Sequence, residues 1–235
     1  MSEVQPQRLL DDHPIFEACK IGDVDAVERY LKAGVSVYAE SEHNPTIASI
    51  ATHHKHTQLL DLLAGYGLEF SCPFNRFGEP LIFIAVRAGD IGLIDYFLCR
   101  GVDPNIQDNF GGTPIKIAAG GGKVDVVKFL AGQGVDVLDK RKLGATPFRE
   151  ASRNNQIEVM EVLWLAGADV NEPDDAKVTP LIGCAKGGKL EAVQWLLDHG
   201  ADINAKDGRG KTALQWAETN RHVAVAELLR QRGVE

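Results

Sequence analysis

Cysteine is scarce in this chain, and the four cysteines show no spacing typical of a metal site or a disulfide framework. Three of them, Cys19, Cys99 and Cys184, fall at positions that elsewhere in the chain carry small or apolar residues. We therefore predict that these three are buried free thiols. Cys72, in an irregular segment, is the one that we expect to be exposed.

The chain also lacks long apolar runs, a leader-like start and an excess of basic residues. No apolar run approaches the roughly 18 residues of a membrane span, and the opening MSEVQPQRLLDDHP has no apolar segment behind a basic one. A net charge of −8 argues against a general nucleic-acid binder, which needs a basic surface to displace counterions. We therefore expect a cytoplasmic protein that binds neither membranes nor nucleic acids.

What the chain does contain is a glycine that returns at nearly fixed intervals of 33 or 34 residues. This column comprises Gly34, Gly67, Gly101, Gly134, Gly167, Gly200 and Gly233. A second column lies 21 residues earlier and reads His13, Thr46, Pro80, Thr113, Thr146, Thr179 and Thr212; we call it the threonine position. Periodicity of this length predicts one small unit copied seven times, whose copies stack and bury their apolar faces against each other.

The repeat that begins at Thr146 shows how one unit should fold. Thr146 can cap a helix, and Pro147 suits the first helical position, where no amide donor is lost. The apolar residues after Asn155 recur with a period of 3.6, which predicts a second helix there. Gly167 should end this helix with a positive φ. The predicted fold class is therefore an all-α repeat solenoid, in which stacked helix-turn-helix units are joined by β-hairpin-like fingers.

These units resemble the ankyrin repeat. The clearest copies run from Thr179-Pro180-Leu181 to Gly200-Ala201-Asp202-Ile203-Asn204, and from Thr146-Pro147 to Gly167-Ala168-Asp169-Val170-Asn171. The resemblance covers about residues 12–235 and implies a single solenoid over 1–235, with repeat cores near 13–37, 46–70, 80–104, 113–137, 146–170, 179–203 and 212–235. The region 41–79 departs most from the pattern, since Lys55 replaces the glycine between the two helices.

Two segments suggest a chemical function, and neither meets its requirements. Residues 205–212 fit a relaxed phosphate-loop pattern, but they lie in repeat register, where a finger turn is expected instead of the loop of an α/β unit. His53, His54 and His56 cannot easily converge on one ion, and no carboxylate or thiolate stands at helical spacing beside them. We therefore predict exposed turn histidines, no metal, no cofactor and no enzymatic activity.

The resemblance implies that a partner contacts the finger tips and the concave side of the first helices. Three residues before the threonine position, the tips carry His43, Phe77, Phe110, Leu143, Ala176 and Arg209. Neighbouring exposed rings are typical of interface hot spots, and Arg76 precedes the first of them. The alternative is that the rings fold back against their own fingers.

The concave side has a column of its own, seven residues after the threonine position. It reads Lys20, His53, Arg87, Gly120, Arg153, Lys186 and Thr219. Four fully basic members in an acidic chain would steer an acidic partner into the groove, although basic residues are also common at this position in the family. The predicted partner-binding residues are Lys20, His53, Arg76, Phe77, Arg87, Phe110, Leu143, Arg153 and Lys186.

The sequence thus favours a non-catalytic, monomeric module that binds another protein with an acidic contact surface. It would act as a stoichiometric inhibitor or an immunity-type neutraliser of an enzyme or toxin. The alternative is an adaptor that joins two proteins through separate surfaces. An enzyme that uses 205–212 or the histidines, and a nucleic-acid binder that uses the basic column, are weaker hypotheses. Fold alone does not choose among them.

Overall fold

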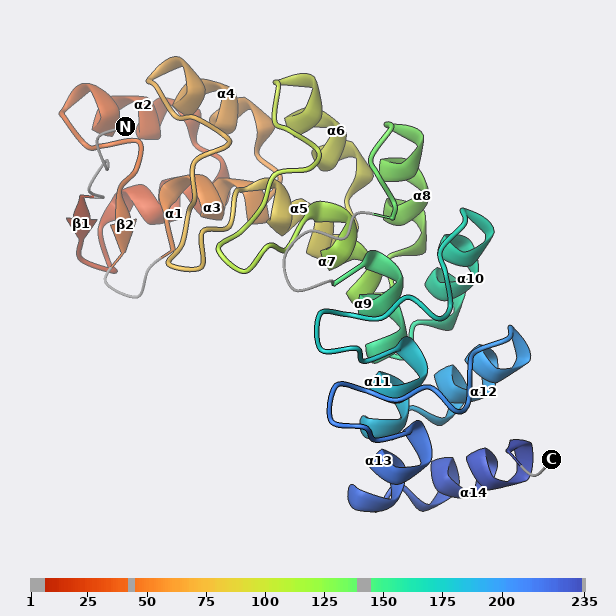
Figure 1. Ribbon diagram of the computed structural model, residues 1–235. Helices are drawn as coiled ribbons and strands as arrows, with labels where there is room; N and C mark the ends of the chain where they lie inside the picture. Colours follow the sequence, from red (N-terminus) through yellow and green to blue (C-terminus); the bar gives the residue numbers. More distant parts are fainter. Residues whose placement is uncertain (1–6, 42–44, 139–144, 234–235) are drawn as a thin grey trace. The chain divides into compact units, whose positions relative to one another are not determined.

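The computed structural model of this chain describes residues 7–41, 45–138 and 145–233. Fourteen α-helices lie in that part of the chain, and they follow one another as pairs of antiparallel helices (Figure 1). Contacts between residues divide the chain into two compact units, Met1–Pro114 and Ile115–Glu235. Within each unit, every helix pair contacts the pair next to it, as expected for a stack of repeats.

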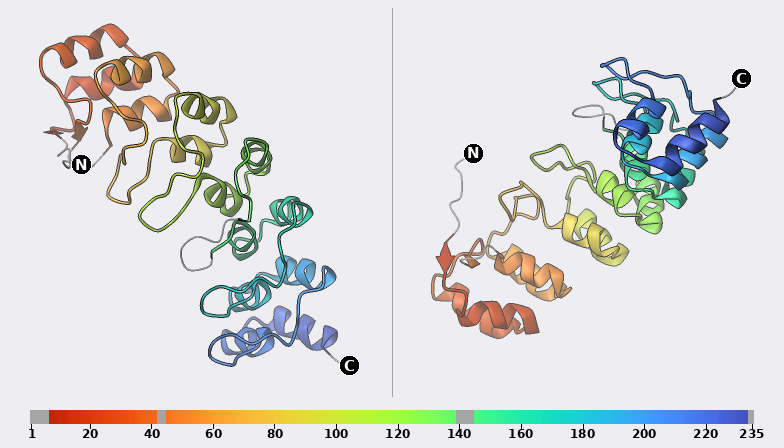
Figure 2. Two further views of the ribbon diagram at one scale, coloured as in Figure 1. Left: turned by 45° about the horizontal axis from the view of Figure 1, so that its top comes forward. Right: turned by 90° about the horizontal axis from the view of Figure 1, so that it is seen from below.

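The first unit contains three complete helix pairs. These are α1 (Pro14–Ile21) and α2 (Val24–Lys32), α3 (Ile47–His53) and α4 (Thr57–Gly65), and α5 (Ile82–Ala88) and α6 (Ile91–Cys99). The first helices, α1, α3 and α5, form one row and the second helices form another (Figure 1 and Figure 2). A two-stranded parallel sheet of β1 (Arg8–Leu9) and β2 (Glu40–Ser41) also lies in this unit, and no sequence pattern predicted it.

The second unit repeats the arrangement. Its helices are α7 (Pro114–Gly120), which begins at the boundary residue, α8 (Val124–Gly132), α9 (Pro147–Arg153), α10 (Ile157–Leu165), α11 (Pro180–Lys186), α12 (Leu190–Asp198), α13 (Ala213–Thr219) and α14 (Val223–Arg232). The first helices α9, α11 and α13 contact one another in order, and so do the second helices α8, α10, α12 and α14.

The predicted capping and core residues occupy their expected places. The hydroxyl of Thr146 accepts a hydrogen bond from the amide of Arg149 at 3.2 Å, and Gly167 follows α10 with φ 99°. Each second helix also carries an apolar residue at one equivalent repeat position, and this residue is buried in every copy from the second onward, at Leu63, Phe97, Leu130, Leu163, Leu196 and Leu229. Stacking therefore buries what a single helix pair would leave in water.

The turn between the two helices of a repeat requires a left-handed residue. Gly22 and Gly89 supply it with φ of 76°, and a Cβ at Gly22 would lie 2.7 Å from the His56 ring of the next repeat. Lys55 takes the same conformation, with φ 60°, and so does Asn155. The missing glycine in the second repeat thus leaves the turn intact, at the cost of the steric strain of a side chain.

One side chain, five residues before the threonine position, organises each finger that the structure describes in full. The Oδ1 atoms accept hydrogen bonds from the amides two and four residues later, at 2.8–3.2 Å. The four side chains are Asn75, Asp108, Asp174 and Asp207. Because these are the bonds of an Asx turn, the fingers are fixed by side chains more than by strand pairing.

The thiols follow the prediction in part. Cys19 and Cys184 are buried, and burial raises the pKa of each to about 12. The prediction for Cys99 is wrong, because this residue ends α6 with its side chain exposed, whereas Cys72 is only half-buried. In the part of the chain that the structure describes, no helix is long and apolar enough to cross a membrane.

Candidate functional site

Two aromatic rings stand side by side at neighbouring finger tips of the first unit. The ring centroids of Phe77 and Phe110 are 6.3 Å apart, and the two residues are 42% and 71% exposed. The guanidinium of Arg76 lies over the Phe77 ring, 4.9 Å from its centroid. The rings are therefore presented to solvent and do not fold back against their own fingers.

The backbone beneath these rings is tightly held. Asp108 binds the amides of Phe110 and Gly112, and the amide of Asn109 donates to the carbonyl of Phe77 at 3.0 Å. This last bond ties one tip to the next. Gly78 leaves room for it, because a Cβ there would lie 2.3 Å from the Asn109 side chain. The two phenyl groups are thus exposed apolar surface on an ordered backbone.

The predicted concave residues of the first unit are exposed, and each has a partner within its own unit. The Lys20 ammonium lies 3.3 Å from Glu17, and the His53 ring lies 3.1 Å from the Ser49 carbonyl. Arg87 forms two hydrogen bonds with the carboxylate of Glu79. Burial favours a raised pKa for Glu79, but its bonds to Arg87 and Asn75 outweigh this and lower that pKa. Arg87 therefore helps to hold the finger that carries Phe77.

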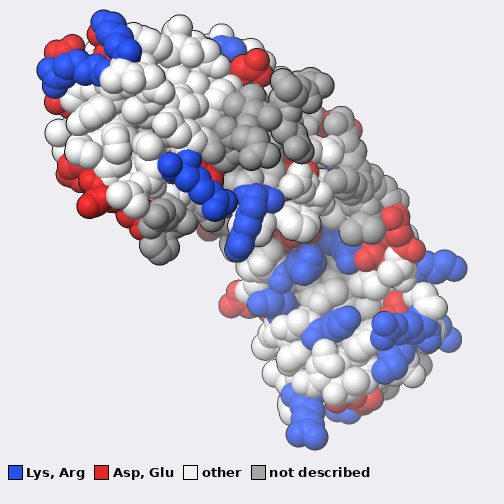
Figure 3. Space-filling model, turned by 90° about the vertical axis from the view of Figure 1, so that its left-hand side faces the viewer, with Lys and Arg blue, Asp and Glu red and all other residues white. Residues whose placement is uncertain are grey.

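In the second unit, three cationic groups surround one buried indole. The ammonium groups of Lys186 and Lys211 lie 4.6 and 4.5 Å from the ring centroid of Trp216, and the guanidinium of Arg209 lies 6.0 Å from it. We call these four residues the Trp216 cluster. Lys and Arg gather over the lower part of the face in Figure 3, the side on which the first helices of the second unit lie in Figure 1.

The carboxylate of Asp207 holds the Trp216 cluster in place. Asp207 accepts the indole N–H of Trp216 at 2.8 Å as well as the amides of Arg209 and Lys211. Burial favours a raised pKa for Asp207, but these hydrogen bonds outweigh it and lower that pKa. The carboxylate thus stays ionised, and its charge offsets only one of the three cations.

The predicted site residues fall into separate groups. Arg76, Phe77 and Phe110 come together in the first unit, and Lys186 joins the Trp216 cluster in the second. Arg153 is exposed, 3.5 Å from Glu150 of its own helix. Leu143 lies outside the residues that the structure describes.

The sequence reasoning missed Lys211 and Trp216. A signal was available, because Trp216 is the one aromatic residue four places after the threonine position, where the other copies carry aliphatic or acidic residues or glycine. The alternation of Arg209 and Lys211 on the preceding finger was a second sign. The finger that carries Arg209 and Lys211 had instead drawn attention as part of the phosphate-loop pattern.

The segments that suggested chemistry have structural roles. Residues 205–212 form a finger turn held by Asp207, and Thr212 caps α13. His56 is half-buried, unlike the exposed histidine that we predicted, because its Nε2 bonds the Lys20 carbonyl of the preceding repeat at 2.8 Å. Across residues 7–41, 45–138 and 145–233, no three His, Cys, Asp or Glu side chains are grouped so that they could hold a metal ion.

Comparisons with known proteins agree with this architecture. Residues 15–108, 82–174 and 162–235 match the family described as ankyrin repeats (3 copies). The ankyrin repeat protein nuc-2 of Neurospora crassa is 30% identical to this chain over 107 residues, which span 46% of the chain and 10% of that protein. Ankyrin repeats generally mediate protein–protein interaction and are typically non-catalytic. With the family matched along nearly its whole length, the chain belongs to the ankyrin-repeat proteins.

Proposed function

We propose that this chain is a protein-binding module that uses the finger tips of its first unit as the anchor for a partner. The observation that carries the proposal is the exposed pair Phe77 and Phe110, flanked by Arg76. Aromatic and arginine side chains dominate the binding energy of protein interfaces. Because the backbone beneath them is already ordered, little conformational entropy remains to be lost on binding.

The Trp216 cluster supports an acidic contact surface on the partner. Lys186, Arg209 and Lys211 create a local positive patch on a chain of net charge −8. Such a patch speeds the encounter with an acidic surface and disfavours basic competitors. Lys20, Arg87 and Arg153 are exposed in their respective units, but each pairs with a carboxylate and so adds little net positive charge.

Within this function we favour a stoichiometric binder, acting as an inhibitor or an immunity-type neutraliser of an enzyme or toxin. One compact aromatic anchor suits a one-to-one complex, in which a few central residues supply most of the affinity. The alternative is an adaptor, which would need a second binding surface with different chemistry.

Affinity capture from native lysate, with quantitative mass spectrometry, tests the proposal. The bait is the whole chain, compared with a Phe77→Ala, Phe110→Ala variant. Ile21→Ala, Leu165→Ala is the matched control, because these residues are 65% and 71% exposed and belong to α1 and α10 instead of a finger. Loss of two hot-spot rings should cost about 2–4 kcal/mol, which weakens binding about 30- to 1000-fold.

The expected result is one protein, near equimolar with the bait, that the wild type and the control retain and the tip variant loses. A partner retained equally by all three baits would contradict the role of the rings. Two partners, of which the tip variant loses one and keeps the other, would favour the adaptor.

A further inference from the structure

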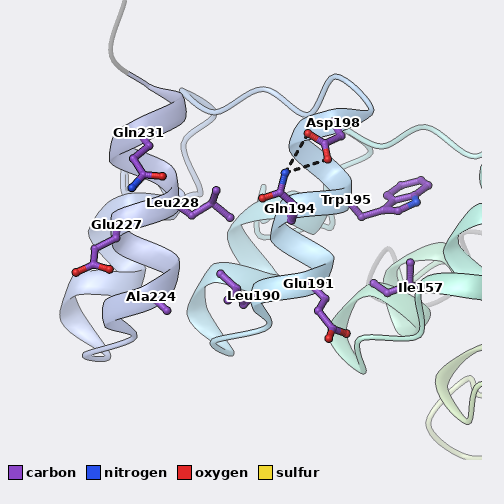
Figure 4. A pocket seen from close by; sticks show the side chains of 10 residues that line it. All are labelled: Ile157, Leu190, Glu191, Gln194, Trp195, Asp198, Ala224, Glu227, Leu228 and Gln231. Atoms are coloured by element: carbon purple, nitrogen blue, oxygen red, sulfur yellow. Dashed lines mark hydrogen bonds between the residues drawn. The ribbon is translucent and has the colours of Figure 1, made fainter.

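A groove runs between the second helices of the second unit, on elements that the proposed function does not use. Its volume is about 680 Å³, and it lies along α12 and α14 with its edge at α10. Figure 4 shows its floor, to which Leu190 of α12 and Ala224 and Leu228 of α14 contribute. Leu190 is 42% exposed, so part of its apolar surface is open to solvent.

Two equivalent gaps between second helices are crossed by a side-chain bridge that this groove lacks. Between α10 and α12, the indole N–H of Trp195 donates to Glu161 at 3.1 Å; between α4 and α6, the hydroxyl of Tyr96 donates to Asp61 at 2.7 Å. The same two repeat positions hold Gln194 and Leu228 across the groove. Leucine has no polar group with which to complete the bridge.

Gln194 lines the groove, and its amide is engaged on its own helix. Its amide donates to both carboxylate oxygens of Asp198, one turn later on α12, at 3.1 and 2.9 Å (Figure 4). Ala224 is too small to fill the space that is left. The apolar floor therefore stays accessible along the middle of the two helices.

Carboxylates border this apolar floor. Glu191 and Asp198 line it from α12, and Glu227 lines it from α14. Arg232 pairs with Asp198 and so joins the ends of the two helices, while Glu191 accepts a hydrogen bond from the neutral amide of Asn155 at 2.9 Å. An apolar strip with an acidic border is complementary to an apolar strip with a basic border.

The dimensions of the groove match a short helix. α12 has nine residues and is therefore about 13 Å long. Apolar side chains at positions i, i+4 and i+7 of a bound helix span about 10 Å. One such face could thus contact the floor along its whole length.

We propose that this groove binds a basic amphipathic helix of a second protein, with the apolar face of that helix over Leu190, Ala224 and Leu228 and its lysines or arginines against Glu191 and Glu227. The groove lies in the row of second helices, whereas the Trp216 cluster lies at the first helices and fingers of the same unit. The two surfaces can therefore be occupied independently.

Fluorescence anisotropy tests this with a labelled peptide of about 18 residues that carries leucine at helical spacing and lysine elsewhere. The same peptide with glutamate in place of lysine is the control ligand. The full chain is compared with Glu191→Lys, Glu227→Lys. The matched control variant is Asp95→Lys, Asp125→Lys, because Asp95 holds the repeat position of Glu227 and Asp125 that of Glu191, and both are exposed.

The groove variant should bind the lysine peptide at least about tenfold more weakly, and the control variant within about twofold of the wild type. Ala224→Phe fills the groove without changing charge and should also abolish binding, while circular dichroism and thermal melting check that it folds. Equal weakening by the two lysine pairs, equally tight binding of the glutamate peptide, or unchanged binding by Ala224→Phe would each overturn the proposal.

The finger variant Phe77→Ala, Phe110→Ala separates this inference from the proposed function. It should bind the lysine peptide as the wild type does. If it loses the peptide, the peptide sits at the finger tips and the groove is not its site.

Discussion

Replacing Asp108 with alanine should loosen the finger tip that presents Phe110. The Asp108 Oδ1 accepts the amides of Phe110 and Gly112, each at 2.8 Å. Its other carboxylate oxygen packs so closely against Gly112 that a Cβ there would lie 2.5 Å away. Alanine removes both side-chain hydrogen bonds at once, and the turn is then held only by its backbone bonds, between Asp108 and Gly112 and between Gly111 and Asp108.

The expected loss can be worked out from these bonds. A hydrogen bond to a charged acceptor contributes about 1.5–3 kcal/mol net, and the lower end applies here because the Phe110 amide, once freed, reaches water. Two such bonds suggest a local destabilisation of about 3 kcal/mol. This energy corresponds to about a 150-fold loss of protection of the two amides.

Amide hydrogen exchange, followed by NMR at Phe110 and Gly112, measures this loss directly. Asp108→Asn is the matched control, because it keeps the acceptor oxygen and loses only the charge. The chain already contains this arrangement in the preceding finger, where Asn75 binds the amides of Phe77 and Glu79 at 3.0 and 3.2 Å. We expect the asparagine variant to lose less than about tenfold in protection, which is under about 1.4 kcal/mol.

Equal protection in the alanine and asparagine variants would refute this reasoning. It would mean that the backbone of the finger holds its shape without the side-chain acceptor. A loss in the alanine variant that extends equally to amides of α5 would also contradict it, because the effect would then be global unfolding instead of local opening.

Two further predictions concern titratable groups. Hydrogen bonds lower the pKa of Asp207 below its ordinary value of 3.8, so its stabilising effect should be present above that pH and be lost as the pH falls through the folded-state pKa. In thermal melts from about pH 7 to about pH 2.5, Asp207→Asn should be less stable than wild type at neutral pH and nearly equal to it in acid. A difference in stability that stays constant with pH would contradict this. Cys99 should react with a thiol reagent near pH 8 in the native protein, whereas Cys19 and Cys184, with pKa values of about 12, should react only after denaturation. Rapid labelling of Cys184 in the native protein would contradict the conclusion that its thiol is buried.

The repeat architecture could be predicted from the sequence because its signals are local. Thr146 and Gly167 mark the ends of helices whatever surrounds them, and a period of 33 residues leaves few other arrangements. The exposure of Cys99 was misjudged because it stands at a helix end, where the repeat pattern constrains side-chain direction least. β1 escaped notice because two residues carry no periodicity, and their partner strand follows about one repeat later.

The site could be predicted only in outline. Phe77 and Phe110 were identified because they share one position in neighbouring repeats. The Trp216 cluster could not be assembled in the same way, because its members come from a first helix, a finger and the next first helix. The groove was harder still, because its lining comes from α10, α12 and α14 and becomes visible only when these helices are placed together.

The finger design also bears on how such a chain could change its partner over evolutionary time. The acceptor side chain bonds the backbone of the tip residue and makes no demand on the side chain there. Phenylalanine, alanine and arginine accordingly occupy equivalent tips, at Phe110, Ala176 and Arg209, on turns with the same hydrogen bonds. Mutation at a tip can therefore alter what the protein recognises while the residues that fold the finger are inherited unchanged.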